Sequence, residues 1–295
     1  MSNKERIGFI GVGLMGRGMA GNLVKKGWPV TVMAHRNRAP VEELVALGAA
    51  EAATPKAVAE ASDIVILCVT GSTQVAEIVN GPDGLRAADK PLVLVDCSTS
   101  DPAATLALAV DLAPAGISLV DAPLGRTPAD AEAGTLDVMV GGDPQVVARV
   151  MPVLGAFAGR IMETGATGTG HTMKLLNNFL SMGYGALYAE ALALGAKAGV
   201  TAETFDKVIR GGRMDCGFYQ TFFDYVLTGN ENAHPFALRN GLKDMTYLAS
   251  LAQATGTQNP LGAAVRNSFA LAVGLGHGDR YVPMLADVIA EANKG

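Results

Sequence analysis

The first half of the chain alternates short apolar runs with segments of helical pattern, and this alternation restricts the fold more than any other feature. Because strands that are apolar on both faces need cover on both sides, the pattern predicts an α/β fold with a doubly wound parallel sheet. The predicted strands are Ile7–Ile10, Val30–Met33, Ile64–Val69, Pro91–Asp96, Ser118–Asp121 and Asp137–Val140. The predicted helices are Leu14–Lys25, Pro40–Leu47, one capped by Gly71-Ser72-Thr73, one from Pro102 to Ala113 and one from Pro144 to near Leu154.

The second half has a different character. The sequence Gly-Ala-Thr-Gly-Thr-Gly at residues 165–170 indicates a loop, and strand patterns almost disappear after it. We therefore predict two domains, residues 1–164 with the sheet and residues 165–295 with helices alone. The predicted helices are His171–Ala198, one from Thr201 to Arg210, Phe218–Leu227, Leu238–Gln253, Leu261–Val273 and Val282–Ala292.

Composition excludes several classes of protein. The net charge of −5 argues against a surface for nucleic acid. Three cysteines form no disulfide framework, and the four histidines lack metal-ligand spacing, so we expect a cytoplasmic protein without a metal site. The apolar stretch Phe179–Val200 contains Glu190 and Lys197, which favours a buried helix over a membrane span.

A glycine-rich turn follows the first predicted strand directly and opens a helix. It reads Gly11-Val12-Gly13-Leu14-Met15-Gly16, the G-x-G-x-x-G pattern. Gly11 would permit the tight turn, Gly13 would let the backbone approach a pyrophosphate, and Gly16 would let helix and strand pack closely. We predict a Rossmann-type dinucleotide site formed by residues 11 and 13–16; the alternative is a turn without a ligand.

The end of the second strand bears on the choice of dinucleotide. The segment Met33-Ala34-His35-Arg36-Asn37-Arg38 lacks the acid that usually binds the 2′-hydroxyl of NAD. Arg36 and Arg38 could instead hold a 2′-phosphate through forked hydrogen bonds, so NADP(H) is preferred over NAD(H). His35 and Arg36 are the predicted cofactor contacts in this segment. In the alternative, the arginines are solvated loop charges. Val69 and Thr70, at the carboxyl end of another strand, are also predicted cofactor contacts.

A polar stripe marks the helix that follows the junction. Lys174, Asn177, Asn178 and Ser181 stand at i, i+3, i+4 and i+7 among apolar neighbours. Carbonyl reduction needs a proton donor, and a partly desolvated lysine can serve. The alternative is an interface lysine with structural amides. His171, one turn earlier, is interpreted as ordinary helix N-terminal polarity rather than as a group that tunes Lys174.

These motifs together resemble the β-hydroxyacid dehydrogenase family, which includes 3-hydroxyisobutyrate dehydrogenases, glyoxylate/succinic semialdehyde reductases and sulfolactaldehyde reductase. The resemblance covers nearly the whole chain. It rests on residues 8–16, Asp96-Cys97-Ser98-Thr99, Asp121-Ala122-Pro123, Ala133-Gly134-Thr135-Leu136, residues 168–178 and Lys243-Asp244. It implies a Rossmann domain followed by an all-helical domain like the C-terminal domain of 6-phosphogluconate dehydrogenase.

The resemblance also implies residue roles. Lys174 matches the catalytic lysine and Asn178 the asparagine that places substrate, with Asn177 beside it. Thr99 and Lys243 are implied cofactor contacts, and Ser98 an implied substrate contact. Gly125, Arg126 and Thr127 stand where many members have Ser-Gly-Gly. This Gly-Arg-Thr resembles the sulfolactaldehyde reductase version and suits a carboxylate or sulfonate.

The predicted function is hydride transfer between NADP(H), or NAD(H), and a small hydroxy acid or semialdehyde, with Lys174 as general acid/base. Two alternatives remain: a reaction on an imine or a hydroxy amino acid in the same pocket, and a cofactor-binding scaffold without catalysis. The small-residue helix after Asn178 predicts a homodimer or homotetramer. No nucleic acid, membrane or metal partner is expected.

Overall fold

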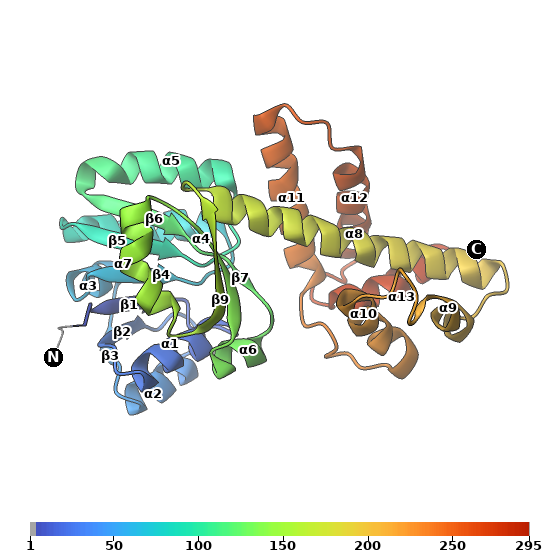
Figure 1. Cartoon of the computed structure of the whole chain (residues 1–295), viewed down its shortest axis with the longest axis horizontal. Helices are drawn as coiled ribbons and strands as arrows, with labels where there is room; N and C mark the ends of the chain where they lie inside the picture. Colours follow the sequence, from blue (N-terminus) through green and yellow to red (C-terminus); the bar gives the residue numbers. More distant parts are fainter. Residues whose placement is uncertain (1–3, 295) are drawn as a thin grey trace. The chain divides into compact units, whose positions relative to one another are not determined.

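The structure, a computed structural model, describes residues 4–294 and divides into two compact units (Figure 1). Unit 1 extends to Lys174 and unit 2 begins at Leu175, so the division falls inside helix α8 (Thr169–Lys197). The first turn of α8 belongs to unit 1 because it packs on the sheet there. The domain boundary between residues 164 and 165 stays a prediction.

Unit 1 contains a sheet of nine strands within residues 4–294. The order β3-β2-β1-β4-β5-β6 is parallel throughout, which confirms the doubly wound α/β fold. Beyond β6 the pairing changes, because β8 runs antiparallel to β6 and β7. The strands are β1 (Ile7–Ile10), β2 (Val30–Met33), β3 (Ala50–Ala52), β4 (Ile64–Leu67), β5 (Leu92–Asp96), β6 (Ile117–Asp121), β7 (Leu124–Gly125), β8 (Leu136–Gly141) and β9 (Ala158–Gly165).

Helices cover both faces of this sheet. Alternate residues of β4 belong to different cores: Ile64 and Ile66 to the core of α1, α2 and α7, Val65 and Leu67 to that of α3, α4 and α5. Burial on both faces explains why these strands are continuous apolar runs. The helices are α1 (Gly16–Lys25), α2 (Ala39–Ala46), α3 (Pro55–Glu60), α4 (Ser72–Asn80), α5 (Pro102–Leu112), α6 (Pro128–Ala133) and α7 (Pro144–Leu154), with 3₁₀ turns at Leu85–Ala88 and Ala113–Ala115.

Several short elements were not predicted, namely β3, β7, β9, α3 and α6. Local caps mark the two helices: Thr54 accepts from the N–H of Ala57, and Thr127 forms a capping box with Asp130. Strand β9 pairs with β8 and has no fully buried residue, so it lacks the apolar pattern of the central strands. The predicted elements have their expected types, with ends shifted by a few residues.

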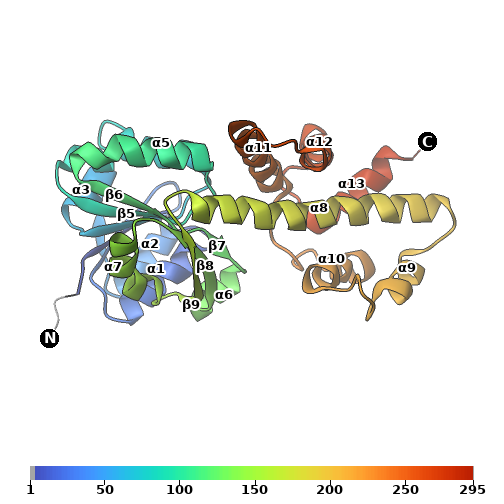
Figure 2. The same ribbon diagram turned by 45° about the horizontal axis from the view of Figure 1, so that its top comes forward.

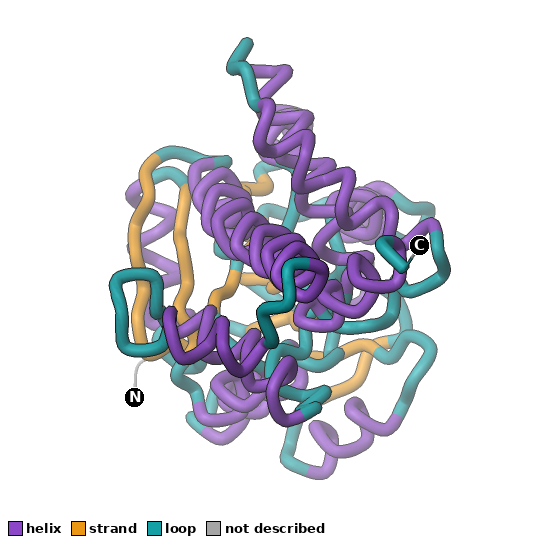
Figure 3. Tube along the Cα trace, turned by 90° about the vertical axis from the view of Figure 1, so that its right-hand side faces the viewer, coloured by secondary structure: helices purple, strands orange, loops and turns teal. Residues whose placement is uncertain are grey.

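Unit 2 is helical, as predicted, and Figures 2 and 3 show its long helices. Its core is built by α8, α11, α12 and α13, with a second aromatic cluster around α10. Within residues 4–294, no helix is both long enough and apolar enough to span a membrane. The remaining helices are α9 (Ala202–Ile209), α10 (Gly217–Thr228), α11 (Leu238–Thr255), α12 (Pro260–Gly274) and α13 (Leu285–Ala292), with a 3₁₀ turn at Val282–Met284.

Candidate active site

The glycine turn between β1 and α1 has the geometry that a dinucleotide loop needs. Gly11 has φ +101°, and a Cβ there would lie 2.2 Å from the carbonyl oxygen of Cys68. A Cβ on Gly16 would lie 2.0 Å from the oxygen of Gly11, so helix and turn are in direct contact. A Cβ on Gly13 would meet nothing within 4 Å, which leaves space beside the backbone. Leu14 is 76% exposed, and Met15 immediately precedes the helix.

The carboxyl ends of β4 and β5 are joined by a hydrogen bond through Ser98. The backbone N–H of Val69 donates to Ser98 Oγ at 3.0 Å, and the N–H of Ser98 donates to Asp96 Oδ1 at 2.9 Å. Ser98 is expected to touch substrate. In the structure its side chain is buried and holds the backbone at Val69, which follows β4. Thr70 and Thr99 follow the same strand ends; Thr70 is exposed and Thr99 is partly buried.

The two arginines after β2 have different surroundings. Arg38 makes ion pairs with Glu51 at 3.1 Å and Glu42 at 3.5 Å. Arg36 is exposed and forms no ion pair with any residue in 4–294. His35 beside it is exposed as well. Arg36 could therefore bind a 2′-phosphate without breaking an ion pair, whereas Arg38 would have to leave Glu42 and Glu51.

The segment Gly125-Arg126-Thr127 is tied to its own surroundings. Arg126 adopts φ +76° and its guanidinium contacts Asp137 at 3.1 Å and Asp130 at 3.7 Å. The Thr127 hydroxyl lies 2.5 Å from Asp130 Oδ2 as the cap of α6. Gly125 packs against Asp137, whose Cβ would be 3.3 Å from an added Cβ. An incoming acid would thus compete with Asp137 for Arg126.

Our interpretation of His171 as ordinary helix-end polarity is wrong. The side chain is fully buried, with Nδ1 2.8 Å from Thr105 Oγ1 and Nε2 3.7 Å from Asp96 Oδ2. Polar groups at a helix terminus are normally solvated, and burial of this kind requires dedicated partners. His171 therefore belongs to an internal polar cluster.

In unit 2, a buried acid organises the remaining predicted residues. Asp244 is 1% exposed and accepts a hydrogen bond from Asn178 Nδ2 at 2.6 Å. Its other oxygen lies 3.1 Å from Lys243 Nζ, which also lies 5.1 Å from the centre of the Tyr247 ring. Asn177 lies beside Asn178, with its Nδ2 3.4 Å from Asn178 Oδ1. Helix α8 places Lys174 one turn before Asn178.

Sequence reasoning assigned no role to Asp244, Asp121 or Asp96, although all three stand in the motifs of the resemblance. Each is almost fully buried. The available signal was their setting, because an acid that directly follows or interrupts an apolar run is seldom buried without a partner.

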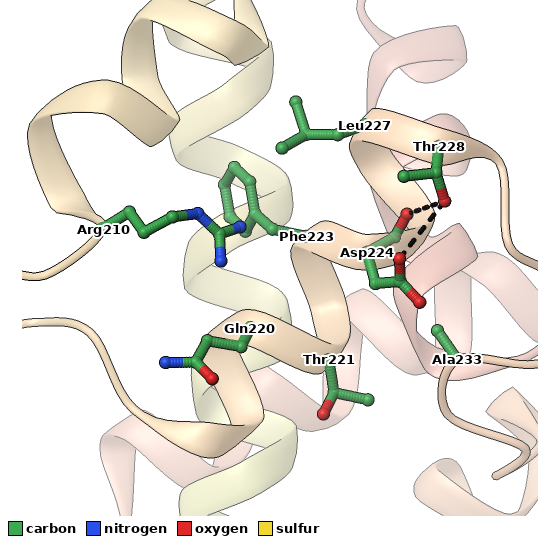
Figure 4. Close-up of a pocket in the computed structure, with 8 residues that line it drawn as sticks. All are labelled: Arg210, Gln220, Thr221, Phe223, Asp224, Leu227, Thr228 and Ala233. Atoms are coloured by element: carbon green, nitrogen blue, oxygen red, sulfur yellow. Dashed lines mark hydrogen bonds between the residues drawn. The ribbon is translucent and has the colours of Figure 1, made fainter.

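An open pocket of about 420 Å³ lies elsewhere in unit 2 (Figure 4). Arg210 on one side already pairs with Asp206 at 2.8 Å, and Asp224 on the other accepts from Asn230 at 2.6 Å. None of the predicted site residues lines it. Because the charged groups that line this pocket already have partners, we assign the pocket no role in catalysis.

The cysteines near the site are unsuited to nucleophilic chemistry. Burial raises the pKa of the Cys68 thiol to about 12 and raises the pKa of Cys97 well above its ordinary value. A thiolate is the reactive form, so both side chains are inert near neutral pH.

Family models match both parts of the chain. Residues 6–165 match the NAD binding domain of 6-phosphogluconate dehydrogenase. Residues 168–286 match a model described as NAD-binding of NADP-dependent 3-hydroxyisobutyrate dehydrogenase. The glycine turn fits such a dinucleotide, since the space beside Gly13 is open and α1 has no acid in its first turn.

Individual relatives cover almost the full length. A 2-(hydroxymethyl)glutarate dehydrogenase of Eubacterium barkeri is 35% identical over 95% of this chain and 93% of its own. A 3-sulfolactaldehyde reductase of Escherichia coli is 31% identical over 92% and 91%. The solved 3-hydroxyisobutyrate dehydrogenase of Mycobacterium tuberculosis, with L-serine, gives a TM-score of 0.85 at 27% identity over 99% and 100%. The chain therefore belongs to the β-hydroxyacid dehydrogenase family, whose members are NAD(P)-dependent oxidoreductases acting on CH–OH groups.

Proposed function

We propose that this protein interconverts a small hydroxy acid and the corresponding semialdehyde or oxo acid with NADP(H), and that Lys174 is the general acid/base. The observation that carries the proposal is the arrangement along α8. Lys174 stands one turn before Asn178, and the Asn178 amide is fixed by the buried Asp244. A fixed amide beside a lysine can hold a substrate oxygen in line for proton transfer.

The division of labour follows from the side chains. Bound nicotinamide supplies the hydride acceptor or donor. In the oxidation, neutral Lys174 removes the hydroxyl proton; in the reduction, its ammonium returns a proton to the carbonyl oxygen. Asn178 orients that oxygen, and Lys243 lies against Asp244 on the same side of unit 2 as Asn178.

A substrate panel tests this function. Small hydroxy acids, semialdehydes and sulfonates are assayed with NADP⁺ or NADPH by absorbance of the reduced nicotinamide. We expect turnover of acidic substrates and little turnover of neutral analogues of the same length. Turnover confined to neutral alcohols or aldehydes would contradict the proposed substrate class.

NADP(H) preference is supported by Arg36, and Arg38 provides a matched control. Replacing Arg36 by alanine is expected to lower kcat/KM for NADPH by about tenfold and leave NADH nearly unaffected, because only NADPH carries the phosphate. Replacing Arg38 by alanine breaks the ion pairs with Glu42 and Glu51, and it should change kcat/KM for NADPH and NADH to the same extent. Steady-state kinetics with both cofactors measure the ratio; equal losses for NADH and NADPH in the Arg36 variant would refute the assignment.

Recognition of the substrate acid is proposed for Arg126, with Thr127 and Gly125 shaping the segment. Replacing Arg126 by alanine should raise KM for acidic substrates by about tenfold. Replacing Asp137 by asparagine should lower that KM, because Asp137 neutralises the guanidinium from 3.1 Å. KM values for an acid and its neutral amide separate the two effects. If the Arg126 replacement raises KM equally for the neutral amide, Arg126 supports the local structure and does not bind the acid group of the substrate.

A hydroxy amino acid is the second candidate substrate. It is favoured by the L-serine in the solved 3-hydroxyisobutyrate dehydrogenase and by a relative named NAD-dependent L-serine dehydrogenase, 30% identical over 94% of this chain. Serine and its analogues therefore belong in the substrate panel.

A homodimer or homotetramer is proposed from the apolar row on α8. Leu176, Leu180, Leu187 and Leu194 follow helical spacing and are 41%, 60%, 63% and 72% exposed. Such a row is typical of an interface with a second copy. The cytoplasm is the proposed location, since Cys68, Cys97 and Cys216 are free thiols.

A further inference from the structure

The helix that carries Lys174 takes its cap from a distant strand. Gly168, which precedes α8, has no side chain to satisfy the first N–H groups. Instead the Asp121 carboxylate, at the end of β6, accepts from the N–H of Gly168 at 2.7 Å and from the N–H of His171 at 2.8 Å. A negative charge is also favourable beside the positive end of the helix dipole.

The glycines around Asp121 show how tightly this junction is packed. A Cβ on Gly170 would lie 2.6 Å from the carbonyl oxygen of Met139 and 2.9 Å from Asp121 Oδ2. A Cβ on Gly141 would lie 2.9 Å from Asp121 Oδ1. The backbone of the first turn therefore lies directly on the ends of β6 and β8, where a larger residue would displace it.

The side chain of His171 adds contacts to two further elements. Its Nδ1 lies 2.8 Å from Thr105 Oγ1 on α5, and its Nε2 lies 3.7 Å from Asp96 Oδ2 at the end of β5. Asp96 is itself held by the N–H of Ser98 and the hydroxyl of Ser100. Backbone and side chain of this one residue thus connect α8 with β5, β6 and α5.

Burial makes these connections restrictive. His171 and Asp121 are fully buried, so a polar atom that loses its partner there has no bulk water to replace it. The first turn is consequently held by the hydrogen bonds of Asp121 to the backbone and of His171 Nδ1 to Thr105. His171 Nε2 has no hydrogen-bond partner within residues 4–294 and only lies near Asp96. Lys174 follows His171 by three residues on the same rigid helix, so its backbone position is fixed by the same contacts.

We propose that Asp121 and His171, with Asp96 and Thr105, are positioning residues for Lys174: they hold the first turn of α8 on the sheet and thereby set the reach of the lysine to the substrate oxygen. This rests on the proposed role of Lys174. Misplacement of a reacting group by about 1 Å can cost about 100-fold in rate, so the anchor has a kinetic consequence as well as a structural one.

The test compares two replacements of nearly equal shape. His171→Leu removes both side-chain contacts, whereas His171→Asn keeps an amide near the place of Nδ1 and can retain the bond to Thr105. We expect His171→Leu to lower kcat by about 10- to 100-fold and to shift the pH profile of kcat, with His171→Asn within about threefold of wild type. NADPH affinity should stay unchanged in both, because the glycine turn is not touched.

A second readout does not depend on activity. Hydrogen exchange of the backbone amides from Gly168 to Lys174 should accelerate in His171→Leu and in Asp121→Asn, with little change in α1. Thr172→Val is the matched control, since its hydroxyl makes a 2.8 Å bond to the Gly168 carbonyl but lies outside the cluster. This control should leave kcat and the pH profile at wild-type values.

The outcomes separate the two proposals. A His171→Leu protein that melts at lower temperature but keeps wild-type kcat, pH profile and exchange from Gly168 to Lys174 overturns the positioning role. If that variant does not fold, Thr105→Val, which leaves the ring in place, decides by the same three measurements. Full turnover by Lys174→Met would instead refute the proposed function, while the exchange measurement would still report on the anchor.

Discussion

Replacing Lys174 by methionine is expected to lower kcat by about 1,000-fold while leaving the dissociation constant for NADPH within about twofold. Methionine keeps the length of the aliphatic stem but cannot exchange a proton. The close contacts of Gly11 and Gly16 and the hydrogen bond from Val69 to Ser98 do not involve Lys174, so these supports of the proposed cofactor site should persist. Steady-state kinetics and fluorescence titration of NADPH give the two quantities.

Lys197 supplies the matched control for this experiment. It is the last residue of the same helix and is exposed. Lys197→Met should retain wild-type kcat, because only a lysine at the reacting oxygen can exchange the proton. A Lys174→Met enzyme with unchanged kcat would show that another group, or water, transfers the proton.

The parts of the fold that could be predicted from sequence are those coded by neighbouring residues. The glycine pattern at residues 11–16 can be recognised within six residues of sequence. Close contacts require Gly11, against Cys68, and Gly16, against Gly11, whereas Gly13 has open space beside it. The strands of the sheet interior were predicted because burial on both faces makes them apolar throughout. Strand β9 was not predicted, because none of its residues is fully buried and it carries polar residues such as Arg160 and Glu163.

The parts of the site that could not be predicted depend on residues far apart in the chain. Asp121 caps α8 through the N–H of Gly168, 47 residues later in the chain. Asn178 and Asp244, which share a hydrogen bond, are 66 residues apart. No periodicity or spacing marks such pairs. Arg126 was assigned to an anionic substrate by its type, while its contact with Asp137 depends on the pairing of β7 with β8.

A common principle connects these long-range pairs. A buried carboxylate must be compensated, and one that binds two donors fixes both of them in space. Asp121 does this for the backbone at the start of α8, and Asp244 does it for Asn178 and Lys243. Asn178 and Lys243 are thus oriented by Asp244, and the helix turn that precedes Lys174 is held by Asp121.

Replacing Asp244 by alanine is expected to lower kcat by about 100-fold, the second largest effect after Lys174, because one change releases two oriented groups. Asn178 loses its 2.6 Å hydrogen bond and Lys243 loses its ion partner at 3.1 Å. Removing one member of a buried charged pair should also destabilise the protein by about 3 kcal/mol. Kinetics normalised to folded protein and denaturant unfolding separate the two losses. Asp244→Asn should be intermediate, since one amide oxygen can still accept from Asn178.

Asp287 provides the control that distinguishes orientation from stability. It lies in the same unit and likewise serves two donors, the Tyr225 hydroxyl and Arg280, the latter at 2.6 Å. Asp287→Asn should therefore lower the free energy of unfolding without changing kcat, since neither donor belongs to the proposed site. Equal losses of kcat in the Asp244 and Asp287 variants would mean that activity merely follows stability. If Asp244 orients Asn178 and Lys243, kcat should fall in the Asp244 variant and not in the Asp287 variant.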